Sequence, residues 1–247
     1  MAEKGPSFPP PLASSWRDPA GGPLTPEERA IRRAAVGELG SALRDLVDAA
    51  VRTEVTLPEL AEATGLAREL AARLRGESRS LHEIASVDDP EIGERWYSPV
   101  YGPGNPVAPP LVVTDAADGR AIGRVTLGKP HEGPPGLGHG GVVATLLDHV
   151  LARAVRAAGR GGLTATLTVT YRRPVRLGVA LLATAEVGTT EGRRTTARAR
   201  LVAENDPGTT LAEAEGLFVA LRPERAADVF ATTGRSITAW TDRSGDG

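Results

Sequence analysis

GLGHGGVVATLLDHV, residues 136–150, is the stretch that decides how this chain folds. Gly136, Gly138 and Gly141 satisfy the pattern G-x-G-x-x-G directly before an apolar helical repeat, which is the fingerprint of a dinucleotide-binding turn. His139 and Asp148 stand in the same stretch, and the fingerprint requires neither of them. Two uses of this turn therefore compete: holding a pyrophosphate, or presenting a helix N-terminus together with a carboxylate.

The surrounding sequence argues against a dinucleotide site. Such a site needs a buried strand before the glycine turn and, after the helix, a parallel strand that ends in an acidic residue. Here KPHEGPP (129–135) precedes the turn, and the strand pattern at 163–173 alternates apolar and polar residues before ending in two arginines. Parallel strands covered on both faces read instead as continuous apolar runs. The glycine pattern alone is a weak signal, so we reject this interpretation.

The start of the helix has the properties of an oxyanion site. The first N–H groups of a helix lack intrahelical partners and lie at the positive end of its dipole. Gly140 and Gly141 let a ligand oxygen approach those groups closely. Asp148 falls at the edge of the apolar stripe, so it is either partly buried or faces a cleft, and His139 is equally well explained as a local cap. The polar face of the helix is predicted to consist of Thr145, His149, Arg153 and Arg156.

The segment before this helix predicts a helical hairpin over residues 25–85. TPEE (25–28) carries the signature of a capping box with proline at the first helical position, and TLPE (56–59) repeats it. The apolar periodicity that follows each signal predicts helices to about Arg52 and about Leu74.

Strand patterns surround the single long helix from Ser98 onward. LVVTDAADGRAIGRVTL (111–127) predicts two strands about a turn at residues 117–119. After the helix, four strands are predicted, with turns at Glu191-Gly192 and at Asp206-Pro207-Gly208. One helix thus serves a whole antiparallel sheet, which makes the fold class α+β.

The first strand after the helix alternates strictly. One face is predicted to carry Leu163, Ala165, Leu167, Val169 and Tyr171, and the other Thr164, Thr166, Thr168 and Thr170.

Both ends of the chain are predicted to be poorly ordered. Residues 1–24 are dense in Pro, Gly and Ser and have no apolar periodicity. Residues 223–247 form a polar C-terminal tail, in which Phe230 and Trp240 are apolar enough to dock.

Composition excludes several classes of function. The net charge of −2 gives no reason to expect a nucleic acid or an anionic membrane as partner. The chain has no cysteine, which excludes disulfides, cysteine zinc sites and thiol nucleophiles and suits a cytoplasmic protein. No stretch predicts secretion or a membrane span. The four histidines, at 82, 131, 139 and 149, lack metal-ligand spacing, and no G-x-S-x-G elbow is present.

GHGGVVATLLDHVLARA (138–154), followed by LTATLTVTYRRPVRLG (163–178), resembles the hotdog-fold acyl-CoA thioesterases of the PaaI-like group, of the thioesterase-superfamily-member type. The elements of that resemblance are His-Gly-Gly, an Asp nine residues after the His, and a strand that opens with Thr and ends in Arg-Arg-Pro. The preceding loop HEGPPG (131–136) is similar to that of many members. The resemblance covers residues 98–222 and implies a curved antiparallel sheet wrapped around one central helix.

The resemblance also implies an activity and an assembly. The reaction would convert acyl-CoA and water to free acid and CoA, with no cofactor or metal, in a homodimer or homotetramer whose sites lie between subunits. The Gly140 N–H would hold the thioester oxygen, and Asp148 would act as general base or as nucleophile. Thr164, from the facing subunit, would orient the water or the carboxylate, and His139 would position the thioester or the loop.

The same resemblance implies contacts with the rest of the substrate. Gly141 would share the oxyanion site. Arg172 and Arg173 could reach CoA phosphates, since guanidinium matches phosphate geometry, or could simply be a solvated strand end. Glu132 lies in the loop where phenylacetate-pathway relatives carry Asn or Gln, so the way in which the water is held is left open.

Two other functions compete with hydrolysis. Ala61 and Gly65 are spaced as in a helix-turn-helix, and a hotdog domain joined to such a module resembles acyl-CoA-sensing repressors. Residues 25–85 hold nine Arg, no Lys and eleven Asp or Glu, whereas DNA-binding modules concentrate positive charge. A non-catalytic acyl-CoA-binding protein is the other alternative. The helical hairpin itself is interpreted as an oligomerisation arm or as a cover over the substrate tunnel.

Overall fold

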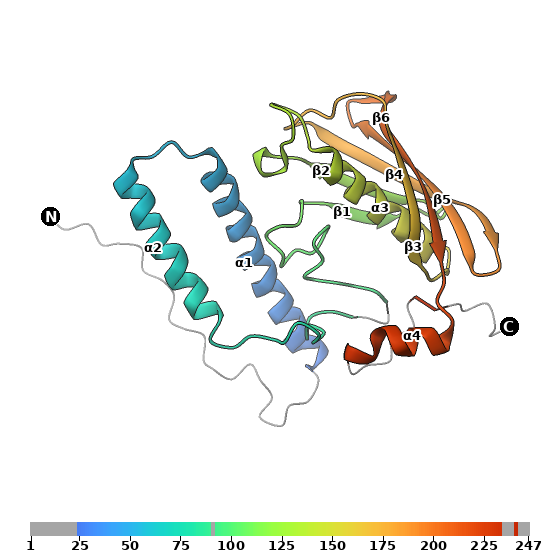
Figure 1. Ribbon diagram of the computed structural model, residues 1–247, viewed down its shortest axis with the longest axis horizontal. Coiled ribbons are helices and arrows are strands. Elements are labelled where there is room, and N and C mark those ends of the chain that lie inside the picture. The colour runs from blue at the N-terminus through green and yellow to red at the C-terminus, as the bar shows by residue number, and fades with distance from the viewer. Residues whose placement is uncertain (1–23, 90–91, 234–239, 242–247) are drawn as a thin grey trace.

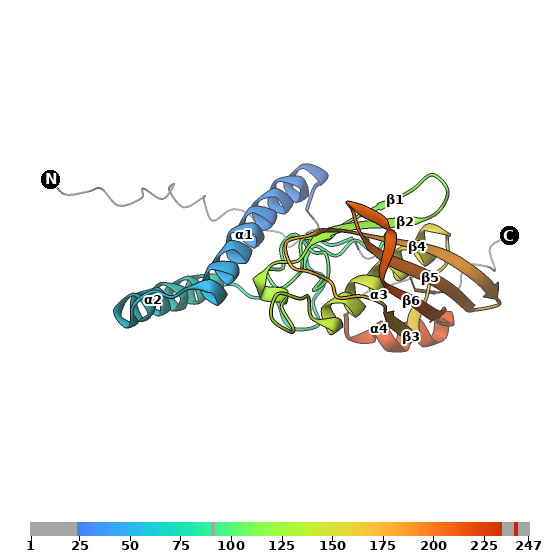
Figure 2. The same ribbon diagram turned by 90° about the horizontal axis from the view of Figure 1, so that it is seen from above.

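A computed structural model describes residues 24–89, 92–233, 240 and 241. One long helix, α3 (Gly140–Ala157), lies against one face of a six-stranded antiparallel sheet with strand order β1-β2-β4-β5-β6-β3 (Figures 1 and 2). This is the α+β arrangement that the sequence predicted. The strands are β1 (Val112–Asp115), β2 (Ala121–Thr126), β3 (Leu163–Tyr171), β4 (Ala180–Glu191), β5 (Arg194–Ala203) and β6 (Asp206–Val219).

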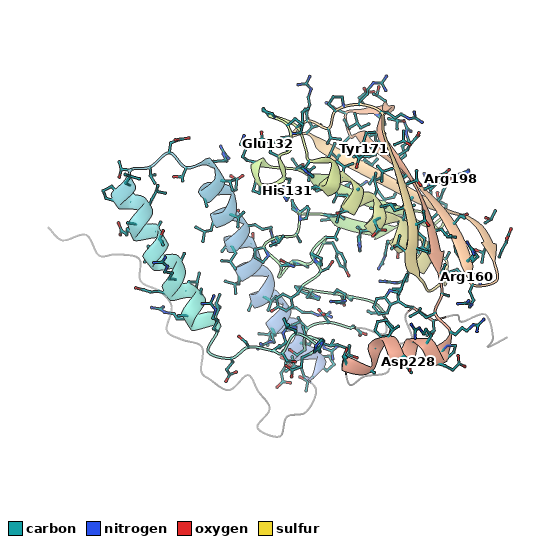
Figure 3. The ribbon with its side chains drawn as sticks, viewed as in Figure 1. His131, Glu132, Arg160, Tyr171, Arg198 and Asp228 are labelled. Atoms are coloured by element: carbon teal, nitrogen blue, oxygen red, sulfur yellow. The ribbon has the colours of Figure 1, made fainter. Side chains whose placement is uncertain are left out.

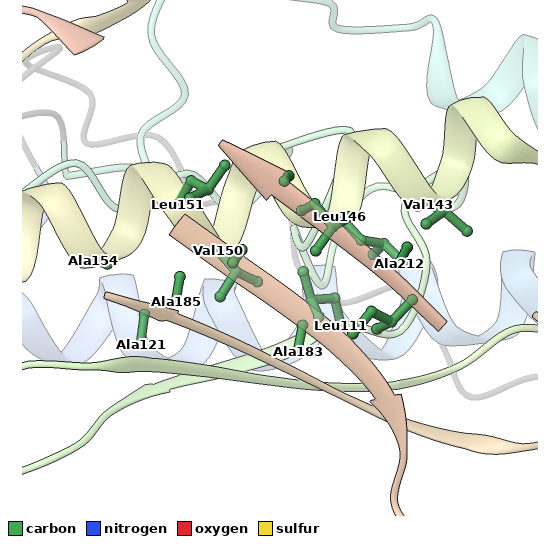
Figure 4. Close-up of a cluster of buried hydrophobic side chains, with 14 of the residues drawn as sticks. Leu111, Ala121, Val143, Leu146, Val150, Leu151, Ala154, Ala183, Ala185 and Ala212 are labelled. Atoms are coloured by element: carbon green, nitrogen blue, oxygen red, sulfur yellow. The ribbon is translucent and has the colours of Figure 1, made fainter. Parts of the chain in front are cut away.

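The core is the contact between the apolar stripe of α3 and the inner face of the sheet. Leu146, Leu147 and Val150 are completely buried. The sheet presents mostly small side chains to them, so the helix can lie close to the strands at the density typical of protein interiors (Figure 4). These small residues are Ala121, Ala183, Ala185, Ala197, Ala199, Ala212 and Ala214.

One predicted turn is wrong in position. The chain turns between β5 and β6 at Glu204-Asn205, and Ala203 pairs with Asp206, so Pro207 and Gly208 already belong to β6. Proline is tolerated there because it stands near the beginning of the strand, where a missing N–H costs little pairing. The turn predicted at Glu191-Gly192 lies one residue later, at Gly192-Arg193, because Glu191 still pairs with Arg194.

Two helices precede the sheet and begin as predicted. In α1 (Pro26–Arg52) and in α2 (Leu57–Leu74), a threonine and the third helical residue form a capping box. The helix-turn-helix alternative at Ala61 and Gly65 is wrong, because α2 runs through Gly65 without a break, as the predicted single helix requires. All residues of α2 lie in the described part of the chain, and none of them is buried.

An irregular segment, residues 92–111, lies between α1 and α3; we call it the strap (Figure 1). Arg33 in α1 donates to the carboxylate of Glu94 at 2.8 Å, and Arg44 donates to the carbonyl of Pro103 at 2.9 Å. Gly40 is buried against the same proline. The side of α1 that faces the strap is therefore held by hydrogen bonds from Arg33 and Arg44 and by close packing at Gly40.

The strap covers the face of α3 that was predicted to be polar. The ring of Tyr101 stacks on His149 with centroids 4.2 Å apart, and Arg156 donates to the carbonyl of Gly93 at 3.0 Å. Burial, together with the charges of Arg156 and Arg153, lowers the pKa of His149 to about 4. His149 is therefore a neutral packing residue at pH 7 and not a polar surface group.

The region predicted to be a C-terminal tail includes a helix, α4 (Pro223–Phe230). Proline at the first helical position and a buried Ala226 explain why this segment is ordered. Phe230 and Trp240 do dock, with ring centroids 5.4 Å apart. The predicted N-terminal tail lies, apart from Leu24, outside the described residues. Every helix in the described ranges is too short or too polar to traverse a bilayer.

Two glycines of α1 provide a matched test of how this helix docks. A Cβ added to Gly40 would lie 2.1 Å from the carbonyl oxygen of Pro103, so Gly40→Ala must displace the strap. We expect a loss of about 1–3 kcal/mol in the free energy of unfolding, as for other overpacked sites. A Cβ on Gly37 would lie 3.6 Å from its nearest neighbour, so Gly37→Ala should gain about 1 kcal/mol from helix propensity. Urea unfolding measures both, and a Gly40→Ala protein as stable as Gly37→Ala would disprove this packing.

Candidate active site

A bulge in β3 brings Thr164 to Asp148. Thr164 pairs with Phe218 of β6 and Thr166 pairs with Leu217, so Ala165 is an extra residue. The extra residue breaks the strict alternation and turns Thr164 to the inner face of the sheet, while Thr166 stays on the outer face. Strict alternation had placed both threonines on one face, and that prediction is wrong.

The consequence is a direct hydrogen bond between the two residues. Thr164 Oγ1 donates to Asp148 Oδ1 at 2.9 Å within one chain. The expectation that Thr164 reaches this carboxylate from a facing subunit is therefore corrected. One carboxylate oxygen is fixed by the threonine, and the half-buried side chain keeps its other oxygen available for a ligand.

His139 is the N-cap of α3. Its Nδ1 accepts a hydrogen bond from the N–H of Gly141 at 3.0 Å, which requires Nδ1 to be unprotonated. The Gly141 N–H is thus already occupied. The Gly140 N–H has no acceptor among the described residues, so of the two predicted oxyanion donors it is the one left open.

Tyr171 is a residue of this site that the sequence analysis did not select. Its hydroxyl donates to the carbonyl oxygen of Gly140 at 2.8 Å. The Gly140–Gly141 peptide is therefore held at both ends, by Tyr171 at its carbonyl and by His139 at its N–H. The alternating pattern placed Tyr171 on the inner face correctly, but no sequence signal reveals that its hydroxyl reaches a helix N-terminus from the far end of β3.

The two halves of the candidate site lie apart on α3. Asp148 follows Gly140 by eight residues, a separation of about 12 Å along the axis at 1.5 Å per residue. An atom within hydrogen-bond reach of the Gly140 N–H therefore cannot touch the carboxylate of the same chain.

The loop before α3 is braced by its own side chains. The carboxylate of Glu132 accepts the N–H of Gly136 at 2.7 Å and pairs with Lys129, and both contacts lower its pKa. His131 Nδ1 accepts the N–H of Gly128, and burial lowers the pKa of this histidine. Both residues lie near the start of α3, with Tyr171 at the same end of the molecule (Figure 3). In this chain Glu132 therefore holds the loop, and its contact with substrate stays a prediction.

The two arginines at the end of β3 lie away from Asp148. Arg172 pairs with Glu213 and lines a shallow hollow of about 520 Å³ on the outer face of the sheet, opposite α3. Arg198 in this hollow pairs with Glu215 at 2.9 Å, and Arg200 donates to the hydroxyl of Thr210 at 2.7 Å. Arg173 donates weakly to the carbonyl of Thr210. Arg172 is thus engaged elsewhere, and phosphate binding by either arginine stays a prediction.

Within the described ranges, no three His, Asp or Glu side chains gather closely enough to hold a metal ion. The site contains a carboxylate, a hydroxyl and a helix N-terminus.

Comparison with known proteins identifies the family. The sequence profile of the thioesterase superfamily matches residues 136–209. A solved structure, that of the thioesterase superfamily protein RHA08564, is 36% identical, with a TM-score of 0.67 over 74% of this chain and 94% of its own. The chain belongs to the thioesterase superfamily. The predicted hotdog fold is thereby confirmed, and the likeness extends well beyond the residues that the profile matches.

Curated relatives share the same central region. Acyl-coenzyme A thioesterase THEM4 of Xenopus laevis is 39% identical over 93 residues, which are 37% of this chain and 41% of that protein. Human acyl-coenzyme A thioesterase 13 is 32% identical over 79 residues, which are 31% of this chain and 56% of that protein. The chain therefore spans about half the length, or less, of these relatives.

The hydrogen bond between the N-cap His139 and the N–H of Gly141 should contribute to the stability of the fold. His139→Ala leaves the N–H of Gly141 without its acceptor, and we expect a loss of about 1 kcal/mol in stability, typical of a removed N-cap. His139→Asn restores an acceptor at the same position and should recover most of that loss. Thermal unfolding of the three proteins is the measurement. Equal destabilisation by Ala and Asn would mean that the imidazole stabilises the fold in some way other than capping.

Proposed function

We propose that this protein hydrolyses acyl-CoA thioesters to the free acid and CoA. The observation that carries the proposal is the hydrogen bond from Thr164 to Asp148, which prepares a carboxylate on the same helix that begins with an open Gly140 N–H. A carboxylate that accepts a proton and a backbone donor that receives an oxyanion are the two groups that acyl transfer to water needs. The names of the relatives, acyl-coenzyme A thioesterases, support the same reaction.

Two copies of the chain are needed to complete one site. About 12 Å of helix separates Gly140 from Asp148, so the donor from one copy has to meet the carboxylate of another. The edge strand β3 supports this arrangement: Leu163 is 40% and Tyr171 52% exposed, and apolar edge strands of this kind are normally covered. A homodimer joined along β3 would cover them.

In the proposed reaction, the thioester carbonyl oxygen accepts a hydrogen bond from the Gly140 N–H of one copy. Asp148 of the other copy takes a proton from a water molecule, whose oxygen attacks the carbonyl carbon. The tetrahedral intermediate then collapses, the carbon–sulfur bond breaks, and the CoA sulfur leaves and takes up a proton. Thr164 holds Oδ1 of Asp148, so that Oδ2 faces the water.

Asp148 could instead attack the carbonyl carbon itself and form an anhydride that water then opens. The hydrogen bond from Thr164 favours the general-base route, because it occupies one carboxylate oxygen and orients the other. A single turnover in ¹⁸O-labelled water separates the routes, since only the anhydride route can place the label in the Asp148 carboxylate. His139 would keep the Gly140–Gly141 peptide in place, and a cytoplasmic location fits the cysteine-free composition.

The first test is release of free thiol from a panel of acyl-CoAs of different chain length. Asp148→Asn should lower kcat by about 10²–10⁴-fold, which is the contribution of a positioned acid–base group. Thr164→Val should lower kcat less, and Thr164→Ser should restore it, because serine keeps the hydroxyl. Bound CoA ester without any thiol release would contradict the proposal and favour the non-catalytic acyl-CoA-binding alternative.

The need for two copies gives a complementation test. Gly140→Pro removes the open N–H at a position where proline suits the helix, since His139 before it is extended. We expect Gly140→Pro and Asp148→Asn each to be nearly inactive alone. After unfolding and refolding together, mixed dimers hold one intact site each, so about a quarter of the wild-type activity should return, as two-fold symmetry requires. No recovery in mixed dimers would place both groups of a site on one chain.

A further inference from the structure

Helix α2 presents an apolar face that nothing in the described structure covers. Leu60, Leu70 and Leu74 are 39%, 37% and 47% exposed, and α2 has no buried residue although it contains five leucines. Most of the stability of a helix in a protein comes from packing of its apolar face, and contiguous exposed apolar surface is unusual unless it is an interaction site. The exposed apolar face of α2 therefore has the properties of a surface that binds a partner.

The apolar residues of α2 form a stripe that is symmetric about its middle. At 100° per residue, the residues that fall within about 60° of Ala67 are nearly all apolar. Leu60 and Leu74 stand seven residues before and after Ala67, and alanines stand four residues before and after it. The stripe consists of Leu60, Ala63, Thr64, Ala67, Leu70, Ala71 and Leu74. A sequence with this symmetry matches a second copy of itself running in the opposite direction.

Two charged residues beside the stripe, one acidic and one basic, also favour pairing with a second copy. On the flank next to Leu66 and Leu70, Glu59 stands in the first turn of α2 and Arg73 in the last. When two such helices pair antiparallel about Ala67, each flank faces the same flank of its partner, so Glu59 of each copy comes opposite Arg73 of the other. In a parallel pair, each flank would face the opposite flank of its partner, so Glu59 and Arg73 would not meet. The charges therefore favour the antiparallel arrangement.

The other candidates for covering this face fit less well. An anionic membrane would require excess positive charge, but residues 26–74 hold nine acidic residues and seven arginines, without lysine. The chain's own sheet lies too far away: α2 and the edge strand β3 stand at opposite ends of the long axis in both views (Figures 1 and 2). The same separation makes this face distinct from the β3 edge.

We propose that α2 pairs antiparallel with α2 of a second copy of this chain, with the two Ala67 residues facing each other at the two-fold axis. The contact buries Leu60, Leu70 and Leu74 of both helices and places two Glu59–Arg73 pairs at its rim. It is independent of the proposed thioesterase reaction, whose groups lie on α3 and β3.

Because the natural chain has no cysteine, single cysteines give a direct test on the full-length protein. Under mild oxidation, Ala67→Cys should form a disulfide-linked dimer in high yield, since small residues at a helix–helix contact come within disulfide reach. Glu69→Cys, which lies about 160° away around α2, is the matched control and should stay unlinked. Equal yields at the two positions, or none at Ala67→Cys, would overturn the proposal.

A mixed experiment fixes the direction of pairing. Leu60→Cys should link to Leu74→Cys when the two proteins are mixed, and neither should link to itself. Self-linking by Leu60→Cys would mean a parallel pair and would overturn the antiparallel arrangement.

Hydrogen exchange tests the contact without an introduced bond. The amides of α2 should be protected in the wild-type protein and should exchange at least tenfold faster in Leu70→Glu, while thiol release per chain stays unchanged. Rapid exchange of α2 in both proteins would overturn the proposal. Co-sedimentation of the wild type, but not of Leu70→Glu, with phosphatidylglycerol vesicles, in the absence of cross-linking, would overturn it in favour of a lipid surface.

Discussion

The burial of one helix against a sheet lined with alanines determines where every other part of this molecule lies. The apolar stripe of α3 can approach the strands closely because the inner face of the sheet offers small side chains, and this close packing fixes the direction of the helix axis. The N-terminus of α3 then points to the loop that contains His131 and Glu132. Its middle presents Asp148 to β3, and its remaining side is left for the strap. The positions of the open Gly140 N–H, the carboxylate of Asp148 and the α1 docking surface all follow from that packing.

The sequence predicted most of this arrangement because its signals are local. Capping boxes, the glycines after α3 and the alternating strands depend on residues a few positions apart, and the helices and strands follow them closely. The predicted helix to about Leu74 forms, and the helix-turn-helix alternative does not, because a single glycine inside a helix costs only about 1 kcal/mol and does not end it. His149 was misjudged because its polar appearance gave no hint that Tyr101, 48 positions earlier, would stack on it.

The candidate site was predicted only in part, for the same reason. His139, Gly140 and Asp148 could be selected because they lie close together on one short segment. The contacts of Tyr171 with Gly140 and of Arg172 with Glu213 join segments 31 and 41 residues apart, and pairing register decides them. The register depends on how all the strands pair, so it cannot be predicted from the residues of one strand alone. The role that we propose for each side chain beyond these contacts depends on a second copy of the chain.

Ala165, the extra residue of the bulge, decides on which face of the sheet the preceding residues of β3 lie. In a regular strand, the face on which a side chain lies depends on whether its distance from a reference residue is odd or even. The bulge adds one residue and thereby reverses this parity for everything before it, which leaves Tyr171 packed inward and brings Thr164 to the same side. The chain thus has two inward-facing polar groups an odd number of positions apart, which no regular strand permits. Insertion or loss of one residue between Thr164 and Thr166 would therefore turn the threonine that contacts Asp148 to the opposite face of the sheet without altering a single side chain.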